Sequence, residues 1–149
     1  MDEFREAFRK KNAVSEKELA DLRGKKILLA EDIPVNAEIM IMLLSTREME
    51  VDLAENGQIA VDMFKESEQG HYAAVLMDMR MPVMDGLEAT REIRALDRED
   101  AKKVPIIALT ANAFDEDVQR SMQAGLNAHL SKPVNPENLF STLENLIEE

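Results

Sequence analysis

The feature that most constrains the fold is a regular alternation, after Gly24, of short apolar runs with stretches of helical periodicity. The apolar runs predict strands over residues 26–30, 51–54, 73–77, 104–109 and 128–130. The other stretches predict helices over residues 34–45, 57–67, 87–96, 114–124 and 136–147. Strands and helices that alternate at intervals of roughly 20 to 30 residues are typical of crossover units and a parallel sheet. We therefore predict a doubly wound α/β domain with right-handed crossovers.

Charge divides the chain near Gly24. Residues 1–26 contain eight Lys or Arg and six Asp or Glu, whereas the remainder contains ten against twenty-four. Such a shift in composition marks a boundary. We predict that residues 1–24 form a linker or helical extension and that residues 25–149 form one globular domain.

Composition excludes several classes of function. The chain has no cysteine, so neither a disulfide framework nor a cysteine metal site is available. A net charge of -12 disfavours binding to nucleic acid or to an anionic membrane. No apolar run is long enough to span a bilayer, and the polar start lacks a signal-peptide core. The expected location is cytoplasmic, without direct membrane contact by this segment.

Five chemically active side chains stand where the predicted strands end. Glu31 and Asp32 follow the first strand, Asp78 the third, Thr110 the fourth and Lys132 the fifth. The carboxyl ends of parallel strands share one edge of the sheet, where a crevice opens. Each residue alone has an ordinary structural interpretation, such as a cap, a turn residue or a solvated lysine. Their joint occurrence at four strand ends favours a functional site.

Three carboxylates in one crevice repel one another, so they require a divalent cation or raised pKa values. A hard ion with oxygen ligands, Mg²⁺ or Mn²⁺, meets this need. Lys132 offers a positive charge, and Thr110 a hydrogen-bond donor, to the oxygens of an anion. Phosphoryl transfer requires these parts, and Asp78 is the candidate nucleophile that forms an aspartyl phosphate.

Four segments resemble the receiver domain of two-component response regulators, over a match from about Lys25 to the end. They are I-L-L-A-E-D at 27–32, L-M-D-M-R-M-P-V-M-D-G at 76–86, P-I-I-A-L-T-A at 105–111 and L-S-K-P at 130–133. The resemblance implies a flavodoxin-like fold with strand order 2-1-3-4-5 and helices on both faces. It also implies that Asp78 accepts a phosphoryl group from the phosphohistidine of a histidine kinase or histidine phosphotransfer domain. Such a domain signals or relays by conformational change and is no conventional enzyme, because it catalyses only its own phosphorylation and dephosphorylation.

The resemblance assigns a metal site to the residues around Asp78. Asp32, Asp78 and the backbone carbonyl of Arg80 would hold Mg²⁺, and Glu31 would act through the waters of the ion. Asp85, in the turn that shapes the loop, is expected to be structural rather than chemical.

The resemblance also implies a set of phosphoryl contacts. Lys132 and Thr110 would contact the phosphoryl oxygens, as would Ala111 and Met79. The peptide bond between Lys132 and Pro133 would be cis, which turns the lysine towards the crevice.

Two further roles concern switching and lifetime. The family couples its threonine, here Thr110, to an aromatic side chain three residues before the lysine, a position that His129 occupies in this chain. His129 either moves with Thr110 or simply hydrogen-bonds a backbone carbonyl. Arg80 and Asn112 occupy positions that tune the lifetime of the phosphorylated state, and Arg80 either shields the phosphoryl group or points to solvent.

The runs at 108–114 and 124–134 resemble receivers attached to hybrid histidine kinases. In that interpretation residues 1–24 are a linker from an upstream kinase core or sensor, whose parent chain can be anchored in a membrane. Homodimerisation stays open. Two other functions compete: an interaction module that ignores phosphorylation, and a metal-dependent phosphohydrolase with an aspartyl intermediate. Against the hydrolase, Arg80 stands where a second carboxylate, two residues after Asp78, would serve as general acid and base.

Overall fold

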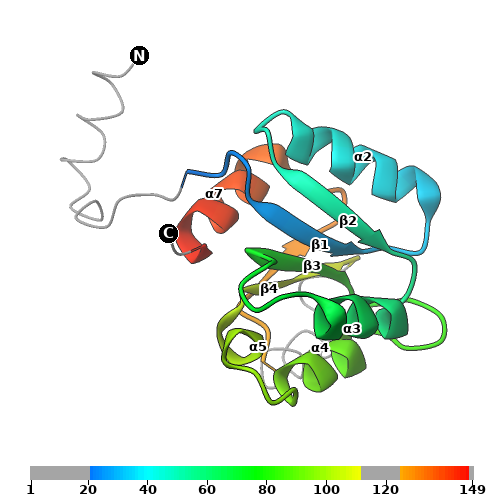
Figure 1. Cartoon of the computed structure of the whole chain (residues 1–149). Coiled ribbons are helices and arrows are strands. Elements are labelled where there is room, and N and C mark those ends of the chain that lie inside the picture. Colours follow the sequence, from blue (N-terminus) through cyan, green and yellow to red (C-terminus); the bar gives the residue numbers. More distant parts are fainter. Residues whose placement is uncertain (1–20, 112–124, 148–149) are drawn as a thin grey trace.

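The computed structural model describes residues 21–111 and 125–147, which build a parallel sheet flanked by helices (Figure 1). In chain order the elements are β1 (Lys26–Ala30), α2 (Pro34–Ser45), β2 (Glu50–Ala54), α3 (Gly57–Glu66), β3 (Ala74–Asp78), α4 (Gly86–Arg94), α5 (Glu99–Lys103), β4 (Ile106–Thr110), β5 (Ala128–Ser131) and α7 (Pro136–Leu146). The sheet has the order β2-β1-β3-β4-β5, and each neighbouring pair is parallel. The predicted architecture and strand order are confirmed.

Most helices begin at a cap or a first-turn proline that is visible in the sequence. The side chains of Asn56, Asp85 and Asn135 accept backbone N–H groups at the starts of α3, α4 and α7. Pro34 and Pro136 occupy the first turns of α2 and α7, where their fixed φ suits a helix. Asp85 thus has a structural role as the cap of α4.

The structure adds one helix that periodicity did not predict. Helix α5 is a single short turn in which only Ala101 is buried, so it shows no apolar stripe. The Arg98 guanidinium holds it in place, because it bonds both Asp100 and the carbonyl oxygen of Phe64 near the end of α3. The helix predicted over 114–124 lies outside the described residues.

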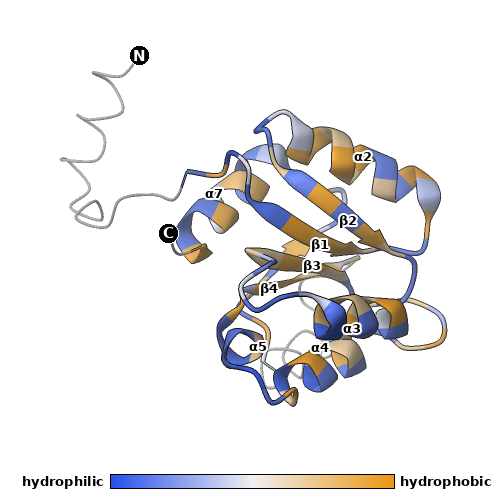
Figure 2. Cartoon of the chain, in the orientation of Figure 1, coloured by the Kyte–Doolittle hydropathy of each residue, from blue (hydrophilic) through white to orange (hydrophobic). Residues whose placement is uncertain are grey.

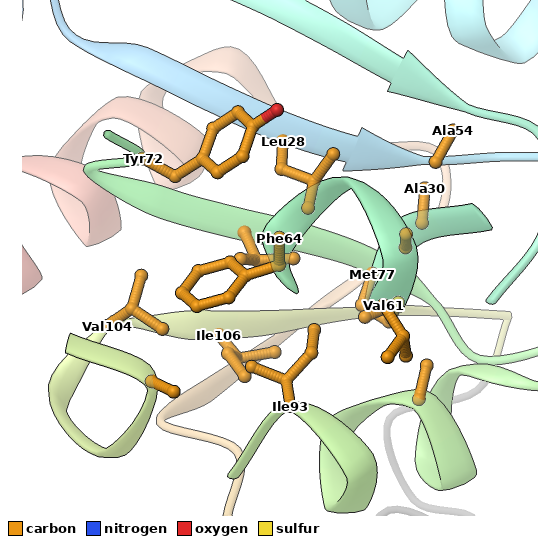
Figure 3. Packing of buried hydrophobic residues seen from close by; sticks show 14 of the residues in the cluster. Leu28, Ala30, Ala54, Val61, Phe64, Tyr72, Met77, Ile93, Val104 and Ile106 are labelled. Carbon is orange, nitrogen blue, oxygen red and sulfur yellow. The ribbon is translucent and has the colours of Figure 1, made fainter. Parts of the chain in front are cut away.

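Each face of the sheet carries its own apolar core. One core fills the space between the sheet and helices α3, α4 and α5, with Phe64, Ile93 and Val104 among its members (Figure 3). The second packs the opposite face against α2 and α7. Side chains alternate between them along a strand, so Leu28 enters the first core and Leu29 the second. Figure 2 shows the contrast between the apolar central strands and the polar α5.

The junction before β1 belongs to the second core. Leu22 is 2% exposed and packs in the same cluster as Ile147, beyond the end of α7. The amide of Gly24 donates to the carbonyl oxygen of Glu48 at 2.8 Å, which fixes the chain where it enters the sheet. The predicted boundary near Gly24 stays a prediction. Across the two described ranges, no helix combines the length and apolarity needed to cross a membrane.

Candidate functional site

The residues predicted at the strand ends lie together at the carboxyl edge of the sheet. Glu31 and Asp32 follow β1, and Asp78 is the last residue of β3. Thr110 ends β4, and its carbonyl oxygen accepts the backbone N–H of Lys132 at 2.8 Å. The peptide bond that follows Lys132 is cis, as the resemblance implied. Parallel pairing thus brings together side chains that are as many as 101 residues apart in the sequence.

Lys132 bridges two buried carboxylates. Its Nζ donates to Asp78 Oδ2 at 2.9 Å and to Glu31 Oε1 at 3.2 Å. Glu31 and Asp78 are only 2% and 4% exposed, whereas the Lys132 side chain is partly exposed, so these charge-assisted contacts lie at the boundary between the interior and solvent. The site therefore holds one ammonium group in direct contact with the candidate nucleophile.

Burial and charge shift the pKa values of this group. Burial raises the pKa of Glu31, and a hydrogen bond shared with the Asp78 carboxyl, together with the Asp78 charge, raises it further. Burial alone would lower the pKa of Lys132, but its contacts with Asp78 and Glu31 outweigh burial and raise it. Lys132 is therefore charged at neutral pH, whereas Glu31 is an acid whose ionised form is disfavoured.

The three carboxylates fit a divalent cation. Oxygens of Glu31, Asp32 and Asp78 lie within 4.8 Å of one another. Asp32 Oδ1 is buried and makes no hydrogen bond. A buried carboxylate oxygen without a partner is costly, and one lysine does not balance three acids. An all-oxygen donor set of this charge suits Mg²⁺, which keeps several waters when the protein supplies few ligands.

The loop after β3 (residues 79–85, the β3–α4 loop) brings backbone groups to the site. The Arg80 amide donates to Asp78 Oδ1 at 3.1 Å, and the residue itself is exposed. The Met79 amide donates instead to the carbonyl oxygen of Leu109, and its side chain packs against the first core. Sequence reasoning missed the Arg80 amide, because no residue type reveals which backbone N–H turns towards a carboxylate. The phosphoryl contact expected of Met79 stays a prediction.

The two predicted switch residues, Thr110 and His129, differ in exposure. Thr110 is half-buried, and Ala111, which follows it, is exposed. His129 lies on β5, exposed, where it is the register partner of Ala108. Movement of His129 with Thr110 stays a prediction, and Asn112 lies outside the described residues.

A family model described as the response regulator receiver domain matches residues 27–144. The hybrid signal transduction histidine kinase I of Dictyostelium discoideum is 35% identical over 124 residues, which cover 82% of this chain and 7% of that protein. Probable histidine kinase 2 of Oryza sativa subsp. indica is 37% identical over 124 residues, covering 76% and 12% respectively. The chain thus spans a small part of these relatives.

Solved structures agree with the family match. The receiver domain of sensor histidine kinase PA1611 from Pseudomonas aeruginosa PAO1, which has a magnesium ion in its active-site cleft, is 43% identical with a TM-score of 0.75, covering 83% of this chain and 97% of that one. The receiver domain of Saccharomyces cerevisiae Ssk1, crystallised with the histidine phosphotransfer protein Ypd1, is 31% identical with a TM-score of 0.74, covering 84% and 90%. Sheet order, strand-end site and family match together show that the chain belongs to the response regulator receiver domains of two-component signalling.

Proposed function

We propose that Asp78 of this receiver domain accepts a phosphoryl group from the phosphohistidine of a histidine kinase or histidine phosphotransfer protein. The observation that carries the proposal is the contact of the Lys132 ammonium with the buried Asp78 carboxylate, 2.9 Å apart, inside a cluster of two further acids. A nucleophile beside a fixed positive charge and a cation site is what phosphoryl transfer requires.

In the transfer, an oxygen of Asp78 forms a bond to phosphorus as the phosphorus–nitrogen bond of the donor breaks, and the imidazole leaves with the electron pair. Lys132 already lies at Asp78 Oδ2, where it offsets negative charge on the transferred oxygens. The hydroxyl of Thr110, the last residue of β4, would donate a hydrogen bond to the transferred oxygens, and the amide of Arg80 already donates to Asp78 Oδ1. The Asp78 carboxylate thus attacks the phosphorus directly, and no other side chain of this domain forms a covalent intermediate.

Mg²⁺ would be held by Asp32, Asp78 and the backbone carbonyl of Arg80, with Glu31 acting through bound water. When bound, the ion neutralises charge on the transferring phosphoryl group. The buried, unpartnered Asp32 Oδ1 supports this assignment, because a cation satisfies it. Mn²⁺ has the same preference for oxygen ligands and would serve in its place.

The surface beside the site supports a protein donor. On α2, Val35, Ile39 and Met42 are 63%, 53% and 70% exposed, at helical spacing that places them on one side. An apolar cleft of about 120 Å³, lined by residues of α2 that include Ile39, opens beside Lys132. Exposed apolar patches of this kind mark protein interaction sites. We name Val35, Ile39 and Met42 the α2 stripe and propose that the donor protein docks on it.

The curated relatives support a place for this domain in a hybrid histidine kinase. The alternative of an interaction module that ignores phosphorylation draws on the same α2 stripe. It differs in expecting that an Asp78→Asn substitution leaves partner binding unchanged in the presence of a phosphodonor.

The proposal is tested by mass spectrometry of the protein incubated with Mg²⁺ and a small acyl phosphate. We expect one added phosphoryl group on the wild type and none on Asp78→Asn. Asp85→Asn is the matched control, because asparagine caps a helix as well as aspartate does and the cap of α4 is retained. A wild type that takes no label, or an Asp78→Asn variant that takes it, would overturn the proposal.

A further inference from the structure

Gly57, at the start of α3, is in direct contact with the β3–α4 loop. Its amide donates to the carbonyl oxygen of Met84 at 3.0 Å. A Cβ atom built on Gly57 would lie 2.3 Å from that oxygen, well inside the ordinary contact distance of 3.4 Å. Helices α3 and α4 pack side by side on one face of the sheet (Figure 1), and only glycine permits this approach of α3 to the loop.

The loop is closed at its two ends. The Gly86 amide donates to the carbonyl oxygen of Met79 at 3.2 Å, so the residues between them form a ring. At the start of this ring the Arg80 amide bonds Asp78 Oδ1. The backbone that reaches the candidate nucleophile is therefore part of the same closed loop that Gly57 contacts.

The middle of the loop has little freedom to deform. The Met84 amide donates to the carbonyl oxygen of Pro82 at 2.7 Å, across a tight turn in which Val83 has a φ of 70°. Proline fixes its own φ, and a β-branched residue at positive φ is strained. We therefore expect a displacement of Met84 to move the other backbone atoms of the loop as well, because the turn itself cannot change shape easily.

The end of the loop at Gly86 also has no room to move. A Cβ built on Gly86 would lie 2.3 Å from the carbonyl oxygen of Asp78, so this end is seated against the backbone of the nucleophile. A side chain at Gly57 would need to displace Met84 by about 1 Å to reach ordinary contact. Met84 belongs to the same hydrogen-bonded ring as Arg80, so a shift of Met84 disturbs the backbone of that ring.

We propose that Gly57 is a positioning residue for the metal site, acting through the Met84 carbonyl and the β3–α4 loop. The inference rests on the proposed function, in which Arg80 contributes a carbonyl ligand to Mg²⁺. Mg²⁺ demands near-ideal octahedral geometry with short bonds, so a displaced Arg80 carbonyl would weaken its binding. Substitution of a residue that orients a metal ligand without binding the metal itself typically lowers metal affinity by 10- to 100-fold.

The test compares Gly57→Ala with Gly70→Ala by calorimetric titration with Mg²⁺, at a temperature at which both variants are folded. Gly70 lies in the connection between α3 and β3, has a φ of 80°, and has no heavy atom within 4 Å of a built Cβ. Alanine is strained there, so Gly70→Ala loses stability without touching the loop. We expect Mg²⁺ affinity to fall 10- to 100-fold in Gly57→Ala and to be unchanged in Gly70→Ala.

A measurement on the wild type covers the case in which Gly57→Ala does not fold. In an NMR titration with Mg²⁺, the amide resonance of Gly57 should shift and saturate together with that of Arg80, and that of Gly70 should stay in place. An unmoved Gly57 amide at saturation, or wild-type Mg²⁺ affinity in Gly57→Ala, would overturn the inference and leave the proposed function intact. A wild type that binds no Mg²⁺ would instead overturn the metal site of the proposed function, and this inference with it.

Discussion

Among the three carboxylates of the site, Asp32 is the one whose negative charge is not offset by a contact with Lys132. Glu31 and Asp78 both contact Lys132, whereas Asp32 Oδ1 is buried without a hydrogen bond. We expect Asp32→Asn to raise the free energy of unfolding by about 1 kcal/mol without Mg²⁺, because it removes one of three neighbouring negative charges. Urea denaturation in the presence of a chelator measures this gain.

Mg²⁺ should reverse the order of stability. A ligand that binds only the folded state stabilises it by mass action, so adding Mg²⁺ should raise the unfolding midpoint of the wild type and leave that of Asp32→Asn nearly unchanged. Asp85→Asn serves as the control and should respond to Mg²⁺ like the wild type, since Asp85 only caps α4. A chelated Asp32→Asn variant that is less stable than the wild type would contradict this view of the site.

Single residues could be predicted where strand ends determine their positions. The alternating pattern predicts a parallel sheet, and the carboxyl ends of parallel strands share one edge. The meeting of Asp78, Glu31 and Lys132 could therefore be predicted. The contact of Gly57 with Met84 could not be foreseen, because it depends on the path of a loop and not on an apolar period. The positive φ of Val83 is equally hidden, since valine normally avoids that region.

Helix α2 is the element whose surface bears most directly on function. We expect the double substitution Ile39→Gln and Met42→Gln to slow phosphoryl transfer from the protein donor about 10-fold, since hot-spot contacts have effects of this size. Labelling by a small acyl phosphate should be unchanged, because both side chains are exposed and lie outside the acidic cluster. Parallel time courses with the two donors measure the difference.

Ile59→Gln is the matched control for this pair. Ile59 is an exposed apolar residue of α3, and α3 packs in the core on the opposite face of the sheet from α2. Transfer from the protein donor should stay at the wild-type rate in this variant. Equal slowing with both donors in the α2 double variant would show damage to the site itself and would refute docking on the α2 stripe.

Elements with an apolar stripe or a cap could be located from the sequence, and the short polar ones could not. Helix α3 was predicted within one residue, because Asn56 caps it and apolar residues follow at helical spacing. Helix α5 has only Ala101 as a buried residue, and its place depends on Arg98, which bonds a carbonyl 34 residues earlier in the chain. Such a tertiary contact leaves no periodic signal.

At the scale of the whole molecule, Leu22 extends the core beyond the predicted boundary at Gly24. We expect Leu22→Ala to lower the free energy of unfolding by about 2 to 4 kcal/mol, because it leaves a cavity in the core under α2 and α7. Arg23→Ala is the control, since Arg23 is exposed, pairs with the exposed Asp21, and should leave the free energy of unfolding nearly unchanged. Urea denaturation of both variants measures the effect, and equal stability would favour the boundary at Gly24.

The described chain enters and leaves the domain on the same side. Gly24 and Leu146 both line one open groove of about 760 Å³, whereas Asp78 lies at the other edge of the sheet. At roughly 3.3 Å per residue, the five residues of β1 separate these edges by roughly 17 Å. Domains whose ends lie close together are readily inserted into longer chains. A tether attached on that side would leave the edge that carries Asp78 facing away from the point of attachment.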